Sequence, residues 1–173
     1  MMISKILLKQ ILKSNRFFGK RIKPRKTPPP KIKKWIKKNN DSIIEKIVVC
    51  RAPVNKIVKK LLNIITIGKF DKSLKGLHYD DIFHLYIYIT INGETWRIEK
   101  NEVVSLKKTN QMESEDCKDI KLRNKQIKLG EFMKKGEDYH KDFWSYDAKN
   151  NNCQDFVISL LLGNKLINKN NKT

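Results

Sequence analysis

A cysteine stands where the sequence predicts the start of a helix, in the stretch "NNNCQDFVISLLLGN" near the end of the chain. The apolar residues after Cys153 recur at a spacing typical of one buried helical face, and the Gly163-Asn164 pair is a stop signal. At a helix start, free backbone N–H groups and the helix dipole favour a thiolate. Cys153 is therefore a candidate nucleophile. The alternative is a small buried residue at a helix start that Asn151 or Asn152 caps.

A nucleophilic thiol needs a base, and the segment "FHLYIYITINGETWRIEKNEVVSL" offers one on a predicted hairpin. Asn92-Gly93 is a strong signal for a two-residue turn between alternating strands. With these two residues at the turn centre, the predicted pairs are Ile91 with Glu94, Ile89 with Trp96, Ile87 with Ile98, Tyr86 with Glu99, and His84 with Asn101. An apolar face and a polar face result, and His84 lies on the polar one.

In this register Asn101 lies across from His84, and Glu99 lies on the diagonal, within reach of an imidazole. Either residue could orient His84, which completes a cysteine-histidine-polar triad with Cys153. The alternative is a polar sheet face with an incidental histidine. His78 and His140 lack a comparable arrangement and are interpreted as loop residues.

The order of histidine strand, polar strand and cysteine helix resembles the circularly permuted papain-like thiol enzymes. This superfamily includes lecithin-retinol acyltransferase, the related small phospholipid acyltransferases and NlpC-type relatives. The matching stretches are "FHLYIYI", "RIEKNEVV" and "NNCQDFV", within roughly residues 41 to 164. The combination of "FHL", "IEKN" and "NNCQDF" is similar to uncharacterised proteins of virophages, Polinton-like elements and large DNA viruses. Lecithin-retinol acyltransferase has a second histidine where this chain offers Glu99 or Asn101.

The resemblance implies an α+β fold: a permuted papain-like domain over residues 35–164, with an antiparallel sheet packed against the nucleophile-bearing helix and helices before it. It also implies a thiol hydrolase or acyltransferase acting on an ester or amide. A lipid ester is favoured because the basic, amphipathic start of the chain would hold the domain on anionic membrane. In that chemistry Cys153 attacks, His84 is the base, and Glu99 or Asn101 orients His84. No cofactor is expected. The alternatives are a cysteine peptidase or isopeptidase, and a non-catalytic virion component that binds nucleic acid on a papain-like scaffold.

Two helices are expected before the hairpin. Ser42 and Glu45 form a capping-box pattern ahead of an apolar run that ends at Pro53, and a second helix is expected over residues 54–65. The stretch 105–128 is predicted as a polar loop followed by one or two strands.

The basic charge is concentrated at the start of the chain. Of 38 Lys and Arg residues, fourteen lie in residues 1–40, which contain no Asp or Glu. Residues 1–34, with the proline-rich stretch "KPRKTPPPK", are predicted to be a largely disordered basic arm. Its contacts with anionic lipid or nucleic acid are assigned to Lys20, Arg21, Lys23, Arg25 and Lys26. A solvated arm without a partner is the alternative. Residues 165–173 are predicted to be a disordered polar tail.

The three cysteines, Cys50, Cys117 and Cys153, are odd in number and widely spaced, with no CxxC pair. This pattern favours a reducing compartment and no structural metal. No secretory signal or membrane span is recognised in the sequence. We therefore expect a cytoplasmic protein, in a host cytosol or a virion if the origin is viral.

Overall fold

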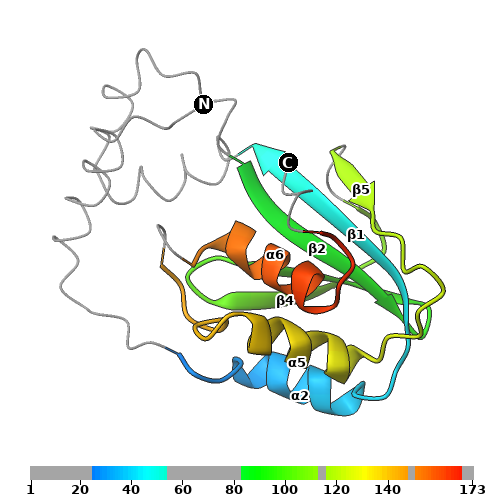
Figure 1. The fold of residues 1–173 in the computed structure, drawn as a ribbon, viewed down its shortest axis with the longest axis horizontal. Coiled ribbons are helices and arrows are strands. Elements are labelled where there is room, and N and C mark those ends of the chain that lie inside the picture. The colour runs from blue at the N-terminus through cyan, green and yellow to red at the C-terminus, as the bar shows by residue number, and fades with distance from the viewer. Residues whose placement is uncertain (1–24, 54–82, 113–115, 148–150, 169–173) are drawn as a thin grey trace, which may run out of the picture.

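The computed structural model describes residues 25–53, 83–112, 116–147 and 151–168. Within these ranges an antiparallel five-stranded sheet of order β4-β3-β2-β1-β5 is covered on one face by three helices (Figure 1). The elements are α2 (Pro30–Lys38), β1 (Ile44–Pro53), β2 (Phe83–Ile91), β3 (Glu94–Lys100), β4 (Val104–Thr109), β5 (Cys117–Asp119), α5 (Leu129–Tyr139) and α6 (Cys153–Gly163). The predicted α+β class, with an antiparallel sheet packed against the cysteine-bearing helix, is confirmed.

The predicted β2–β3 hairpin has the register derived from its sequence. Tyr86 pairs with Glu99, and the pairing continues to Ile91 with Glu94. The turn residues Asn92 and Gly93 have φ values of 49° and 70°. Positive φ at both positions is what a turn matching the strand twist requires, and asparagine and glycine tolerate it best. The turn chemistry therefore fixes which side chains of β2 and β3 share a face.

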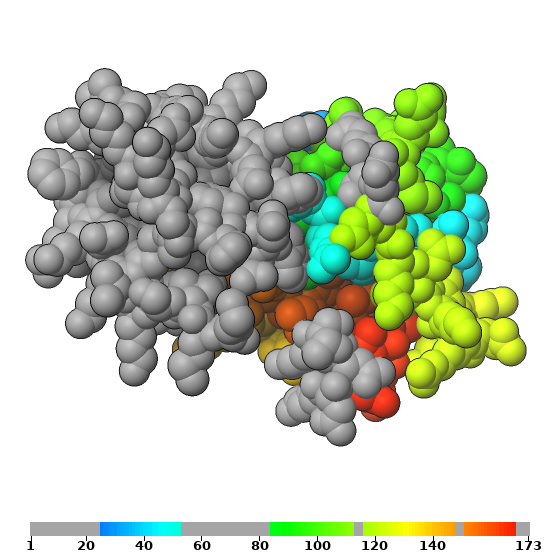
Figure 2. All heavy atoms as spheres, turned by 90° about the horizontal axis from the view of Figure 1, so that it is seen from above, coloured from blue at the N-terminus to red at the C-terminus, as the bar shows by residue number. Residues whose placement is uncertain are grey.

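The main core lies between the sheet and the helices. Ile87, Ile89 and Ile98 of the hairpin are fully buried against Phe132 of α5 and Phe156 of α6. Figure 2 shows a different side of this layer, where β1 (cyan) and the chain around β5 (yellow-green) lie next to α6 (orange to red). This packing holds the start of α6 close to the start of β2.

The helix predicted after Ser42 is wrong, because residues 44–53 form strand β1, paired with β2 along its length. The run is rich in β-branched residues, which suit a strand. Ser42 and Glu45 do not cap a helix. Ser42 Oγ accepts a hydrogen bond from Asn92 Nδ2 (3.0 Å), and the Glu45 carboxylate accepts one from the Gly93 N–H (3.0 Å). The helix predicted over residues 54–65 lies outside the described residues.

The boundaries of the predicted arm and tail also differ from the structure. Helix α2 begins at Pro30, so the predicted boundary at residue 34 falls within it. Proline suits the first turn of a helix, and α2 is held by Ile32 and Trp35, which are buried. Lys31 Nζ of α2 donates to the Leu106 carbonyl of β4 at 2.9 Å. In the predicted tail, Leu166 is buried in the core.

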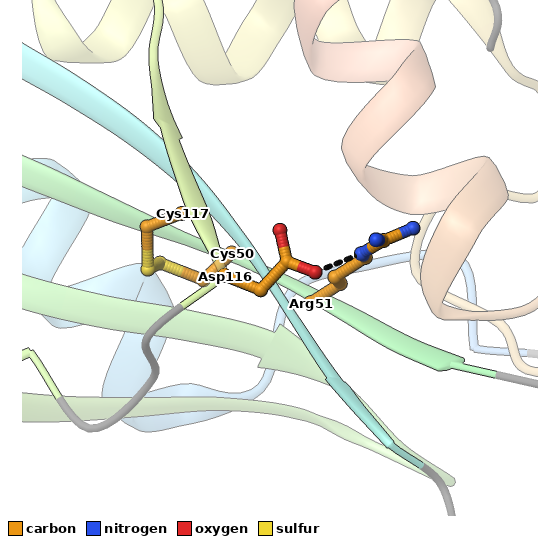
Figure 3. Close-up of a disulfide and its surroundings, with 4 residues drawn as sticks. All are labelled: Cys50, Arg51, Asp116 and Cys117. Carbon is orange, nitrogen blue, oxygen red and sulfur yellow. Dashed lines mark hydrogen bonds and ion pairs between the residues drawn. A yellow bond between two sulfur atoms is a disulfide. The ribbon is translucent and has the colours of Figure 1, made fainter. Parts of the chain in front are cut away.

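A disulfide joins Cys50 of β1 to Cys117 of β5, which are paired across the two strands (Figure 3). Next to it, Arg51 and Asp116 form an ion pair. The expectation of a reducing compartment rested on the odd number and wide spacing of the cysteines, and Cys50 and Cys117 are paired despite that spacing. Cys153 is the one free cysteine.

Among the described residues, no helix has the length and apolar character that crossing a bilayer requires.

Candidate active site

Cys153 is the first residue of α6, as its sequence context predicts. Asn152, one of the two predicted caps, accepts hydrogen bonds at Oδ1 from the N–H of Gln154 (2.8 Å) and of Asp155 (3.4 Å). In return Asp155 Oδ2 accepts from the Asn152 N–H at 3.0 Å, which completes a capping box. This reciprocal pair fixes the helix start and therefore the position of the thiol.

His84 and Cys153 meet at the start of β2. Their side chains form a hydrogen bond, and the Leu85 backbone also bonds to the Cys153 sulfur. The β2–β3 ladder ends at the Tyr86–Glu99 pair, so His84 lies past the last residue of β2 that β3 pairs with. By alternation His84 shares the face of Tyr86, opposite the main core.

Glu99 holds the other side of the imidazole. His84 Nε2 lies 3.1 Å from Glu99 Oε2, the diagonal contact that the register predicts. A hydrogen bond at one ring nitrogen sets the tautomer, so Glu99 fixes both the tautomer and the orientation of the imidazole. Asn101, the alternative orienting residue, is exposed in the turn after β3, where its N–H donates to the Val103 carbonyl. The structure therefore brings His84 together with Cys153 and Glu99, and not with Asn101.

Contact between the imidazole and the thiol changes the acidity of both groups. Burial alone opposes the charged form of His84, but hydrogen bonds to Cys153 and Glu99 outweigh it and raise the pKa of His84 to about 9. Burial likewise opposes a thiolate, yet the hydrogen bond and positive charge of His84 lower the pKa of Cys153. Hydrogen bonds from the backbone at Leu85 and Gln154 act in the same direction. Each group therefore favours the charged form of the other.

Glu99 is itself clamped by neighbours on the same face of the sheet. Arg97 Nη2 donates to Glu99 Oε2 at 2.8 Å, and Ser105 Oγ donates to Oε1 at 3.3 Å. The hydrogen bond from His84 is the largest influence on this carboxyl, and with Arg97 it lowers the pKa of Glu99 to about 2 against the effect of burial. The Arg97 guanidinium also lies over the Tyr86 ring, 4.1 Å from its centroid. Glu99 is thus a fixed carboxylate across the whole physiological range.

Sequence reasoning missed a buried pair beside the site. It did not identify Lys100, and it considered Asn151 as a helix cap and not as the partner of Lys100. Lys100 is buried, and its Nζ donates to Asn151 Oδ1 at 2.6 Å. A signal was present in the register, because Lys100 follows Trp96 and Ile98 on the apolar face of the hairpin. A lysine at such a position needs acceptors, which a sequence pattern alone does not identify.

The remaining predicted site residues lie elsewhere. Arg25 and Lys26 are exposed at the start of the described chain, while Lys20, Arg21 and Lys23 lie outside the described residues. His140 follows α5, and its Nδ1 accepts from the Asp142 N–H at 3.3 Å, as a loop residue does. His78 is outside the described ranges. No group of three or more potential metal ligands is found in the described part of the chain.

Together, Cys153, His84 and Glu99 form a nucleophile, a base and an orienting carboxylate, joined in that order by hydrogen bonds. Comparison of the chain with family models, curated proteins and solved structures finds no match.

Proposed function

We propose that the chain is a cysteine-dependent acyl-transfer enzyme, a thiol hydrolase or acyltransferase with Cys153 as its nucleophile. The observation that carries the proposal is the continuous contact from the Cys153 thiol through the His84 imidazole to the Glu99 carboxylate. A thiol at a helix start with a lowered pKa is reactive, and a carboxylate-held imidazole can both take and return its proton. A histidine that only filled a polar face would need no contact with a free thiol.

In the proposed reaction the Cys153 thiolate attacks the carbonyl carbon of an ester, thioester or amide. The tetrahedral intermediate collapses as the bond to the leaving alcohol, thiol or amine breaks, and the His84 imidazolium gives that group its proton. The thioester on Cys153 then reacts with water, which gives a carboxylic acid, or with an amine or second lipid, which gives a transferred acyl group. His84 accepts the proton of the incoming nucleophile, and Glu99 keeps the imidazole oriented throughout. The backbone N–H of Cys153 is the candidate donor to the oxyanion.

The order of the three elements supports placing this domain among the permuted papain-like enzymes. Strand β2 carries the histidine, β3 carries the orienting residue, and α6 follows with the nucleophile. As a finer part of the proposal, the substrate is a lipid ester, which the basic segment over residues 1–34 would bring close by binding anionic membrane. A peptide or isopeptide substrate is the alternative to a lipid ester.

The thiolate is tested first, by iodoacetamide labelling at pH 6.5 with detection by mass spectrometry. Cys153 in the folded protein should react about tenfold or more faster than in the urea-unfolded protein, because only the folded state holds His84 against the thiol. Equal rates in the two states would remove the nucleophile from the proposal.

Turnover is tested with a short-chain thioester in solution, a phospholipid ester in anionic vesicles and a peptide amide library. Cys153→Ser should abolish turnover of whichever substrate reacts, and a trapped acyl group should appear on Cys153 in the wild-type protein. Reaction with peptides and not with lipids would assign a peptidase. Salt-sensitive nucleic-acid binding without turnover of any of the three would instead support the non-catalytic virion component.

A further inference from the structure

Lys100, the last residue of β3, is buried with an ammonium group that the proposed chemistry does not use. Its side chain is 1% exposed. Nζ donates to the Phe143 carbonyl at 2.9 Å and to Asn151 Oδ1 at 2.6 Å, and its charge lies 5.9 Å from the centre of the Phe156 ring. Both acceptors are neutral oxygens, and no carboxylate of the described residues lies within ion-pair distance of Nζ. Burying a charge this way costs free energy, so a local role must offset the cost.

The acceptor Asn151 ties together the segment that precedes the nucleophile. Its Nδ2 donates to the Ser145 carbonyl at 2.9 Å and to the Asp142 carbonyl. Its backbone exchanges hydrogen bonds with Asp147, at 2.9 and 3.0 Å. Asn151 is buried and stands two residues before Cys153. Fixing Asn151 therefore fixes where the chain enters α6.

The electrostatic neighbours of Lys100 come from two elements. Asp155 and Cys153 lie on α6, and Asp142 lies in the segment after α5; all three favour its charged form. Burial opposes them and lowers the pKa of Lys100 to about 8. Among the described residues, the charge of Cys153 also affects His84 and Tyr146. The pKa of Tyr146 is raised first by burial and then by that charge. A thiolate at Cys153 thus favours the ammonium form of Lys100, and coupling between two charges is reciprocal.

We propose that Lys100 is a positioning residue for the Cys153–His84 pair, acting through its hydrogen bonds to Asn151 and the Phe143 carbonyl and through its charge. The role in catalysis rests on the proposed function, but the effect of Lys100 on the Cys153 thiol can be tested without it. Glu99 and Lys100 are neighbours in β3 and point to opposite faces of the sheet, one to His84 and the other to the segment before Cys153. The end of β3 then positions both His84, through Glu99, and Cys153, through Lys100.

The first test measures the pH dependence of Cys153 alkylation in Lys100→Met. Loss of the charge and of the anchor should raise the apparent pKa of the thiol and slow alkylation at pH 6.5 by about tenfold. Asn164→Ala is the matched control, because Asn164 is also buried and donates to the Phe132 carbonyl (2.9 Å), but at the other end of α6. That control should lose stability and keep the wild-type pH profile. A Lys100→Met profile that coincides with the wild type would overturn the proposal.

A second measurement does not depend on whether Lys100→Met folds. The Lys100 ammonium is titrated by NMR in the wild-type protein and in Cys153→Ser. Because coupling between two charges is reciprocal, removing the thiolate should lower the pKa of Lys100, and an unchanged titration would also overturn the proposal. Failure of the enzyme hypothesis looks different. A coupled Lys100 and Cys153 in a protein that turns over no ester or amide would keep this inference and remove the proposed function.

Discussion

The two ends of the β2–β3 hairpin are made from the same strands and use polar groups in different ways. At the turn, Gly93 contacts Glu45, and Lys108 Nζ lies 2.5 Å from Glu94 Oε1, with both side chains about half exposed. At the open end, the ion pair of His84 and Glu99 has side-chain exposures of 7% and 20%. The same kinds of group are therefore solvated at one end and largely removed from water at the other.

The contacts at the two ends have different effects. An exposed ion pair such as Lys108 with Glu94 contributes little to stability, because water screens it and the side chains lose entropy. At the open end, hydrogen bonds and neighbouring charges outweigh burial, so the pKa of His84 and that of Glu99 move apart, to about 9 and about 2. The turn end specifies the register, and the open end uses that register to set protonation states.

The largest effect is expected for His84→Ala. Removing the imidazolium should raise the pKa of Cys153, and alkylation at pH 6.5 should fall about 100-fold, with turnover reduced at least as much. Glu45→Ala, at the turn end, is the control and should alkylate at the wild-type rate. Labelling kinetics by mass spectrometry check both variants. Equal alkylation rates in the two variants would mean that His84 does not activate Cys153.

Glu99→Gln should have the next largest effect. Losing the carboxylate should lower the pKa of His84 from about 9 and slow Cys153 alkylation at pH 6.5 by about tenfold.

The same variant tests the stability contribution of Glu99. Its folded pKa of about 2 lies below the reference 4.5, so the contribution is present above pH 4.5 and is lost as pH falls toward 2. Between pH 5 and pH 3 the wild-type protein should lose roughly 2 kcal/mol more stability than Glu99→Gln, as measured by urea unfolding. Parallel losses in the two proteins would mean that Glu99 titrates as an ordinary glutamate.

The smallest effect is expected at the turn, for Gly93→Ala. A Cβ at Gly93 meets no atom within 4 Å, so the cost is the backbone strain of alanine at a φ of 70°, about 1 kcal/mol. Thermal unfolding should report that loss while the pH profile of Cys153 stays unchanged. A shifted profile would show that the turn and the site are coupled along the strands.

Local sequence signals predicted the parts of the site that depend on neighbours in the chain. Asn92-Gly93 gave the hairpin register, and this placed Glu99 within reach of His84. The apolar spacing after Cys153 and the asparagines before it gave the start of α6. These features succeed because turn geometry and helix capping are decided within a few residues.

The mispredicted parts depend on partners far away in the sequence. The Ser42 and Glu45 pattern, taken locally, indicates a helix cap. Residues 44–53 instead pair with β2 as strand β1. The two side chains then bind the hairpin turn, which is 48 residues or more away in the sequence. Similarly, the Cys50–Cys117 bond spans 67 residues, and Lys100 finds Asn151 across 51. Propensity and spacing carry no information on such pairings until the topology is known.

The hydrogen bond from Lys31 to the Leu106 carbonyl has a consequence for how copies of this protein meet. Strand β4 ends the sheet on one side, and an uncovered edge strand is a template for pairing with another chain. Lys31 occupies one acceptor of β4, and Lys107 adds positive charge to the same strand. A second copy approaching edge to edge would meet like charges and one carbonyl already taken, so this side of the sheet resists aggregation by strand addition.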